Sequence, residues 1–290
     1  MERRLHNRAN ESTMATQQPR PPAFLGIGAQ KAGTTTLHNL LAQQPQIFVP
    51  PCKEVHYFSL HYAQGLAWYA DHFAGAGATQ VIGEITPYYL FHPQAARRIF
   101  NDLGSSVKIV VLLRDPLART LSHYWHARRH GFETLPLEEA LAAESRRLGD
   151  AEATLKSAEG RHKSHQEHSY LSRSLYRLQV ERFWSLFGRD QVLVLPSEPF
   201  FEDPWPTLQR LALFLDLEPL HPPGQGSSAT VANANPMRES RNGLSAELTL
   251  QLQWQLADSY IFARQELGWG NALGWQWPGQ SGATPSTSNS

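Results

Sequence analysis

One stretch near the N-terminus, Phe24 to Leu37 (FLGIGAQKAGTTTL), constrains the fold more than any other. An apolar run leads into a loop that contains Gly28 and Gly33, and the following LHNLLAQQP has apolar residues at helical spacing. A strand, a glycine-rich loop and a helix in this order favour anion binding, because backbone N–H groups and the positive end of the helix dipole face the loop. The stretch therefore predicts a phosphate-binding loop.

Strand and helix patterns alternate along the rest of the chain. The clearest strand is Lys108–Leu113 (KIVVLL), whose continuous apolar run is typical of a strand buried on both faces of a parallel sheet. Other predicted strands lie at 24–28, 47–49, 80–84 and 191–195. Helices are predicted at 36–43, 60–73, 116–129, 175–187, 201–215 and 244–267, with a helix through 98–100, a charged helix plus loop over 137–160 and a long loop over 221–243.

This alternation predicts an α/β, single-domain, P-loop-like fold with a central, mostly parallel sheet and helices on both faces. In such sheets ligands bind beyond the C-terminal ends of the strands, so residues 28–36, 84–87 and 114–116 are expected at one edge. We expect a disordered tail over 1–21, a domain over 22–277 and a second disordered tail over 278–290, because both ends are polar and rich in residues that do not build a core.

Composition argues against several function classes. The 26 basic and 26 acidic residues give a formal net charge of +0, which does not support general nucleic-acid binding. The 13 histidines are scattered, no HExxH or CxxC occurs, and Cys52 is the only cysteine, so neither a metal site nor a disulfide within the chain is expected. No apolar stretch is long enough for a membrane span, and no secretory signal is visible. One cysteine fits a reducing compartment, and we expect a cytoplasmic protein; the oligomeric state stays open.

Two familiar nucleotide loops differ from this one in detail. A dinucleotide fingerprint GxGxxG beginning at Gly26 would need a third glycine where Lys31 stands. The Walker A pattern GxxxxGK[ST] fits Gly28 and Gly33, but Thr34 occupies the lysine position, and the lysine lies inside the loop instead. The loop is therefore interpreted as a phosphate loop adapted to a different nucleotide.

Four motifs together resemble a known family. They are QKAGTTT at 30–36, KEVHYF at 53–58, LLRDP at 112–116 followed by Arg119 and SHY at 122–124, and SRSLY at 172–176 followed by Phe183-Trp184. Over about residues 22–270 the sequence resembles the PAPS-dependent sulfotransferases, especially the branch with heparan-sulfate sulfotransferase domains and their bacterial relatives. The resemblance implies transfer of the sulfuryl group of PAPS to an acceptor hydroxyl of a carbohydrate, lipid or small metabolite, with adenosine 3′,5′-bisphosphate as by-product and no metal.

The resemblance also implies a set of donor-binding residues. The 5′-phosphosulfate loop would comprise Gln30, Lys31, Ala32, Gly33, Thr34, Thr35 and Thr36. Lys31 would also be catalytic, since a cation there stabilises charge on the leaving oxygen. Arg114 and Ser122 are assigned to the 3′-phosphate, and Tyr176 and Arg241 to further nucleotide contacts. Simpler interpretations are helix capping for the threonines, an Arg114–Asp115 turn with a capping serine for the proposed phosphate contacts, and core packing for Tyr176.

The acceptor side is assigned in the same way. Glu54 matches the family's catalytic glutamate and is the candidate general base, with His56, His123 and Glu84 as alternatives. Lys53, His56 and Trp125 are assigned to the acceptor. Several heparan-type relatives have a lysine where this chain has Ile85, which together with the zero net charge argues against a strongly basic acceptor site.

Two competing functions remain open. A P-loop kinase using ATP and Mg²⁺ is disfavoured by Thr34 at the Walker lysine position. A non-catalytic nucleotide-binding protein on the same fold would tolerate loss of Lys31 and Glu54. The acceptor itself is not determined by these motifs.

Overall fold

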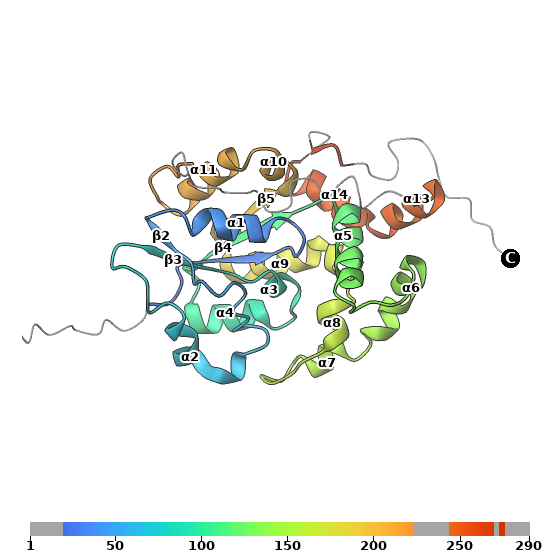
Figure 1. Ribbon diagram of the computed structural model, residues 1–290, viewed down its shortest axis with the longest axis horizontal. Coiled ribbons are helices and arrows are strands. Elements are labelled where there is room, and N and C mark those ends of the chain that lie inside the picture. Colours follow the sequence, from blue (N-terminus) through green and yellow to red (C-terminus); the bar gives the residue numbers. More distant parts are fainter. Residues whose placement is uncertain (1–19, 223–243, 270–272, 276–290) are drawn as a thin grey trace, which may run out of the picture.

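The computed structural model describes residues 20–222, 244–269 and 273–275. At its centre is one five-stranded sheet with the spatial order β2-β3-β1-β4-β5, in which every neighbouring pair is parallel (Figure 1). The strands are β1 (Phe24–Gly28), β2 (Ile47–Phe48), β3 (Val81–Ile85), β4 (Lys108–Leu113) and β5 (Val192–Pro196). The predicted α/β fold with a parallel central sheet is confirmed.

Helices cover both faces of this sheet (Figure 1). The α-helices are α1 (Thr34–Leu41), α2 (Gly65–Asp71), α3 (Tyr88–Phe91), α4 (Ala95–Leu103), α5 (Pro116–Arg129), α6 (Leu137–Arg147), α7 (Ala151–Thr154), α8 (Lys163–Glu167), α9 (Tyr176–Phe187), α10 (Ser197–Glu202), α11 (Pro204–Phe214), α13 (Ala246–Gln255) and α14 (Ala257–Gln265). Short 3₁₀ turns lie at η1 (Tyr62–Gln64), η2 (Ser172–Ser174) and η3 (Arg189–Gln191). None of the helices in the described ranges has the length and apolarity that a membrane span requires.

Strand β4 is continuously apolar because it lies in the centre of the hydrophobic core. Residues Ile109 to Leu113 are each at most 1% exposed, because helices cover both sides of the strand. A second, smaller cluster joins α5 to the C-terminal helices and includes Leu117, Leu121, Leu252 and Leu256. This second cluster fixes α5, which follows β4 and carries several candidate site residues.

Two predicted helices are wrong in their continuity. The helix expected over 201–215 is divided between α10 and α11, because Asp203 caps the new helix by accepting a hydrogen bond from Trp205 N and Pro204 has no N–H to continue the old one. The helix expected over 244–267 is divided at Leu256, whose backbone (φ −98°, ψ 6°) leaves helical geometry. Apolar side chains continue on both sides of Leu256, so the pattern carried no sign of this break.

The order of the strands brings the segments predicted at one edge of the sheet close together. Since β1 lies between β3 and β4, the segments that follow these three parallel strands share the C-terminal edge of the sheet. The segment after β1 is the glycine-rich loop, and the segment after β4 begins with Arg114. Most of the two predicted tails, and most of the predicted 221–243 loop, lie outside the described residues.

Candidate functional site

The loop between β1 and α1 has the backbone geometry of an anion cradle. Gly33 is the N-cap of α1 and has a left-handed conformation (φ 97°). An added Cβ would lie 2.9 Å from a ring carbon of Phe201, so glycine is required both by conformation and by space. Because glycine has no side chain to cap α1, the first backbone N–H groups of the helix are left for another acceptor.

Lys31 lies inside this loop with an unusual electrostatic environment. Its Nζ is 3.4 Å from Nδ1 of His126, which comes from α5. Burial, followed by repulsion from Arg129 and Arg114, lowers the pKa of Lys31 from 10.5 to about 8. The lysine therefore carries positive charge that the protein does not neutralise, and a bound anion would relieve the repulsion.

Arg114 comes from the end of β4 and meets the same loop. Its side chain is 1% exposed and donates a hydrogen bond from Nη1 to the Lys31 carbonyl at 3.2 Å. Asp115 then caps α5 by accepting from Ala118 N at 2.7 Å, with Pro116 in the first turn. The turn at Arg114–Asp115 is thus capped by Asp115 and not by a serine, and Arg114 is directed to the loop. Ser122 follows on α5 and is 7% exposed.

Two further arginines lie close to the loop and are almost fully buried. Arg119 on α5 hydrogen-bonds Ser174 Oγ and the Tyr170 carbonyl, whereas its Nη1 is buried with no hydrogen-bond partner among the described residues. Arg173 donates from Nη1 to Gln30 Oε1 at 2.7 Å, so it fixes the first residue of the QKAGTTT motif. A buried guanidinium nitrogen that lacks an acceptor is a polar group that a ligand can satisfy.

Glu54 lies in a compact polar group with its sequence neighbours. Its two carboxylate oxygens contact Lys53 Nζ at 2.7 Å and His56 Nε2 at 3.2 Å, and 35% of its side chain is exposed. Burial raises its pKa, but the hydrogen bond from His56 and the charge of Lys53 outweigh burial and lower the pKa to about 2. Glu54 is therefore ionised at neutral pH, as a general base must be.

Two of the alternative bases have different environments. Glu84 is completely buried at the end of β3, where its carboxyl group accepts hydrogen bonds from the hydroxyls of Thr86, Tyr69 and Tyr89, and burial raises its pKa. It ties α2 and α3 to the sheet rather than facing an acceptor. His123 is 1% exposed, and burial with repulsion from Arg173 and Arg119 places its pKa well below 6.5, so its imidazole is neutral.

A cavity of about 190 Å³ lies beside the loop. Its walls come from the loop, the Glu54 segment, α3, α5 and the residues just after it, α8 and η2. They are formed by Gln30, Glu54, His56, Pro87, Tyr88, His123, His126, Ala127, Phe132, Gln166, Glu167 and Arg173. The candidate base, its histidine partner and the first loop residue thus face one space, which identifies it as the candidate acceptor pocket.

The remaining predicted site residues differ in burial and in their distance from the cavity wall. Tyr176 is fully buried and donates a hydrogen bond to the Arg114 carbonyl at 2.8 Å, which matches the core-packing interpretation. Trp125 is 41% exposed on α5 and is not part of the cavity wall. Arg241 lies outside the described residues. Of the threonines, Thr34 and Thr36 are buried in the first turn of α1 and Thr35 is exposed; Ala32 is buried behind the loop.

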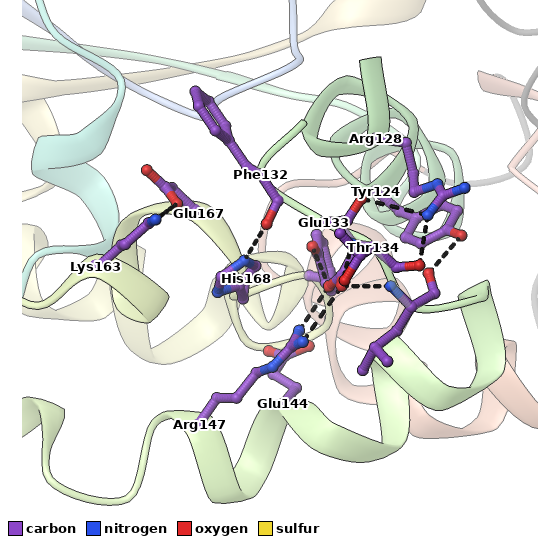
Figure 2. A network of polar contacts seen from close by, with 12 residues as sticks. Tyr124, Arg128, Phe132, Glu133, Thr134, Glu144, Arg147, Lys163, Glu167 and His168 are labelled. Atoms are coloured by element: carbon purple, nitrogen blue, oxygen red, sulfur yellow. Dashed lines mark hydrogen bonds and ion pairs between the residues drawn. The ribbon is translucent and has the colours of Figure 1, made fainter. Parts of the chain in front are cut away.

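Several cavity residues have no local sequence pattern that could have predicted their place. Phe132 follows α5, and Gln166 and Glu167 belong to α8, a helix of five residues with no recognisable motif. Figure 2 shows how a buried carboxylate organises this side: Glu133 accepts from Arg147, while His168 donates to the Phe132 carbonyl at 2.9 Å. These contacts join residues far apart in the chain, which only the fold brings together.

No three metal-ligating side chains gather at one point anywhere in the described ranges. The predicted independence from metal is not tested by this finding. Of the charged groups that act on Lys31, three are arginines and one is Glu54, and this excess of cations suits an anionic ligand.

Comparisons with known proteins agree with this geometry. A family model described as "Sulfotransferase domain" matches residues 21–244. The chain is 41% identical over 133 residues to the membrane-associated sulfotransferase kil1 of Dictyostelium discoideum, covering 41% of this chain and 28% of that protein. It is 26% identical over 203 residues to heparan sulfate glucosamine 3-O-sulfotransferase 5 of Mus musculus, covering 68% of this chain and 54% of that protein.

The chain therefore spans under a third of the first relative and about half of the second. Among solved structures, it is similar to the crystal structure of a sulfotransferase from Alicyclobacillus acidocaldarius, with a TM-score of 0.64 and 28% identity. That match covers 86% of this chain and 99% of the other.

Proposed function

The chain belongs to the sulfotransferase domain family, and from this premise we propose that it moves the sulfuryl group of PAPS to an acceptor hydroxyl of a carbohydrate, lipid or small metabolite. PAPS would supply the sulfuryl group and leave as adenosine 3′,5′-bisphosphate. The observation that carries the proposal is the convergence of cations on a glycine-rich loop at the start of α1. Lys31 in particular holds a positive charge in surroundings that lower its pKa to about 8.

The loop residues fit a nucleotide with two phosphate groups. Gly33 and the first turn of α1 offer backbone N–H groups to the 5′-phosphosulfate group, and Lys31 lies in the loop just before them. Arg114, with Ser122 on the next helix, is proposed for the 3′-phosphate, because a guanidinium recognises phosphate through two N–H groups. The buried Nη1 of Arg119 is a further donor close to this region. Lys31 would stabilise charge developing on the leaving oxygen, an effect worth about 3 kcal/mol in comparable sites.

Glu54 is proposed as the general base, and its contacts suggest how it becomes basic enough. In the free protein the hydrogen bonds from His56 and Lys53 hold its pKa near 2, where a carboxylate accepts a proton poorly. An acceptor hydroxyl that replaces Lys53 at Glu54 Oε1 would remove one of these stabilising contacts and raise the pKa of Glu54. Lys53 would then be free to interact with the sulfuryl group.

The test is transfer of labelled sulfate from PAPS to a panel of oligosaccharides, steroids, phenols and glycolipids. For any acceptor that is sulfated, Glu54→Gln is expected to lower kcat about 10²–10⁴-fold while the affinity for adenosine 3′,5′-bisphosphate is unchanged. Glu181→Gln, on the exposed side of α9, is the matched control and should keep full turnover. Unchanged turnover in Glu54→Gln would remove its role as base, and loss of nucleotide affinity would place it at the donor instead.

The two alternative functions, a P-loop kinase and a non-catalytic nucleotide-binding protein, have less support than sulfuryl transfer. The comparisons name sulfotransferases, and Thr34 replaces the lysine that a P-loop kinase needs, so an ATP–Mg²⁺ kinase is not favoured. A non-catalytic nucleotide-binding protein would show adenosine 3′,5′-bisphosphate binding with no transfer to any acceptor. The cytoplasmic location stays a prediction that rests on the single cysteine.

A further inference from the structure

Resting on the proposed function, we propose that the acceptor is a small hydroxyl compound without anionic groups, and that Glu167 on α8 binds a hydroxyl or ammonium group of that compound. The proposal concerns the 190 Å³ cavity beside the loop and the charges of its walls. It differs from what the names of the heparan sulfate relatives suggest, since heparan sulfate is a polyanion.

Among the side chains that line the cavity, the formal charges are two carboxylates and one guanidinium, and the Glu54 carboxylate is paired with Lys53 from outside the wall. Glu54 and Glu167 both line the cavity, and Arg173 is the one formally cationic Lys or Arg among its described lining residues. Arg173 is 4% exposed, and its donors already serve the protein. They reach Ser169 Oγ at 2.7 Å, Gln30 Oε1 at 2.7 Å, the His165 carbonyl at 2.8 Å and the Gln166 carbonyl at 2.7 Å. These neutral partners leave the charge of Arg173 in place, but few of its N–H groups remain to bind an anionic acceptor directly.

Two histidines of the wall add polarity without charge. Burial and nearby cations place the pKa of His123 well below 6.5, and burial with repulsion from Lys31 lowers that of His126 to about 4. At neutral pH both rings are uncharged, and Nδ1 of the buried His123 has no hydrogen-bond partner in the described part of the chain. These rings suit hydroxyl groups, which can both donate and accept hydrogen bonds.

Glu167 is a wall residue whose carboxylate has a buried oxygen without a hydrogen-bond donor in the described part of the chain. Its Oε2 is buried and accepts no hydrogen bond from the described residues, although 21% of the side chain is exposed. The same oxygen forms a long ion pair of 3.8 Å with Lys163 Nζ, whose side chain is 75% exposed. A carboxylate oxygen removed from water without a donor is unfavourable. A hydroxyl or ammonium group in the cavity would supply that donor, whereas a carboxylate or sulfate would add repulsion.

The volume and the apolar lining of the cavity agree with a small ring compound. The cavity volume of about 190 Å³ is smaller than the roughly 300–1,000 Å³ of pockets for drug-sized ligands. Pro87, Tyr88 and Phe132 provide apolar wall, and Phe132 is 45% exposed at the rim. A ring could lie against this wall while its hydroxyl groups face Glu54 and Glu167.

The experiment compares matched acceptors that differ only in charge. One set is glucose, glucosamine and glucuronate, and a second is tyrosol, tyramine and 4-hydroxyphenylacetate, each assayed for labelled sulfate from PAPS. We expect the neutral or amino member of at least one set to be sulfated with kcat/KM at least tenfold above the carboxylate member. Equal or better transfer to the carboxylates, or no transfer to any neutral or amino member, would overturn the proposal.

Variants of Glu167 test the recognition directly. Glu167→Gln should raise KM for the amino member about tenfold with little change in kcat, and Glu167→Lys should shift the preference toward the carboxylate member. Glu139→Lys makes the same charge change at an exposed position on α6 and should leave the preference unaltered. An unchanged preference in both Glu167 variants would contradict the proposal.

Binding of adenosine 3′,5′-bisphosphate, measured first on the same protein, separates this inference from the proposed function. If the nucleotide binds and only anionic acceptors are sulfated, the inference fails and sulfuryl transfer stands. If the nucleotide does not bind, the proposed function itself fails.

Discussion

Lys31 shows how a single residue can be prepared for its ligand. Its backbone has a positive φ of 74° and its Nζ contacts His126, so the side chain points from the loop toward α5. Three arginines, Arg129, Arg114 and Arg119, add to burial in lowering its pKa to about 8. The free protein therefore holds an ammonium group whose charge is unfavourable until an anion arrives.

This pKa leads to a prediction about pH. In the free protein Lys31 is protonated below pH 8 and loses its charge as the pH rises through that value. Since kcat/KM reports groups of the free enzyme, it is expected to fall above about pH 8, well before an ordinary lysine would titrate. In Lys31→Arg the group stays charged, so the alkaline fall should disappear even if activity is lower. An unaltered fall in the variant would assign the pKa to another residue.

Arg114 gives a second prediction at this scale. If it binds the 3′-phosphate, Arg114→Ala should weaken adenosine 3′,5′-bisphosphate by about 10- to 100-fold more than 5′-AMP, consistent with roughly 1.5–3 kcal/mol for a charged hydrogen bond. The measurement is calorimetric titration of both nucleotides with the same variant, which cancels general effects of losing a buried side chain. Equal weakening of the two nucleotides would contradict the 3′-phosphate role.

The cavity depends on the long excursion of the chain between α5 and α9, which comprises residues 130–175 and includes α6, α7 and α8. Glu133 follows α5 and is 2% exposed; it accepts hydrogen bonds from Tyr170 and from the backbone N–H groups of Thr134 and Leu135, each at 2.9 Å (Figure 2). Arg147 from α6 pairs with the same carboxylate. Phe132 is thus held at the cavity by contacts that reach across this whole excursion.

Glu133 should therefore matter for stability more than for chemistry. Burial raises its pKa, but the hydrogen bonds from Arg147, the backbone and Tyr170 lower it to about 2. A carboxylate with a depressed folded-state pKa stabilises the fold above its unfolded value near 4.5, and this contribution is lost as the pH falls from there toward 2. Glu133→Ala is expected to cost about 3 kcal/mol at pH 7 and much less at low pH, measured by urea unfolding.

Glu139→Ala is the control for this prediction, since Glu139 is exposed on α6. It should change the free energy of unfolding by less than about 0.5 kcal/mol. If Glu133→Ala and Glu139→Ala are equally mild at pH 7, the buried network does not hold the excursion in place.

Some of these elements could be predicted from local sequence patterns, and others could not. The apolar run of β4, the glycine loop and the Asp115-capped α5 follow from local patterns, and their relation to the site could be predicted. The cavity could not, because Gln166 and Glu167 reach it from a short helix with no local signature. The burial of Glu84 under three hydroxyls likewise depends on α2 and α3 packing on the sheet.

For the whole molecule, the distribution of charge matters more than its sum. The chain has a net charge of +0, yet cations converge on the loop that ends β1 and carboxylates line the adjacent cavity. One side of the sheet edge thus suits an anionic donor, and the neighbouring side suits an uncharged or cationic acceptor. This division, with Glu54 facing the cavity and Lys31 in the loop, is the physical basis of the proposed transfer.

The proposed transfer requires that the loop and Arg114 hold a nucleotide with phosphates on both the 5′ and 3′ positions. Calorimetric titration of the protein with adenosine 3′,5′-bisphosphate, and separately with ADP and Mg²⁺, tests it most directly. Adenosine 3′,5′-bisphosphate should bind at least tenfold more tightly than ADP–Mg²⁺, with no requirement for the metal. Tighter binding of ADP–Mg²⁺ would contradict it and favour the kinase alternative.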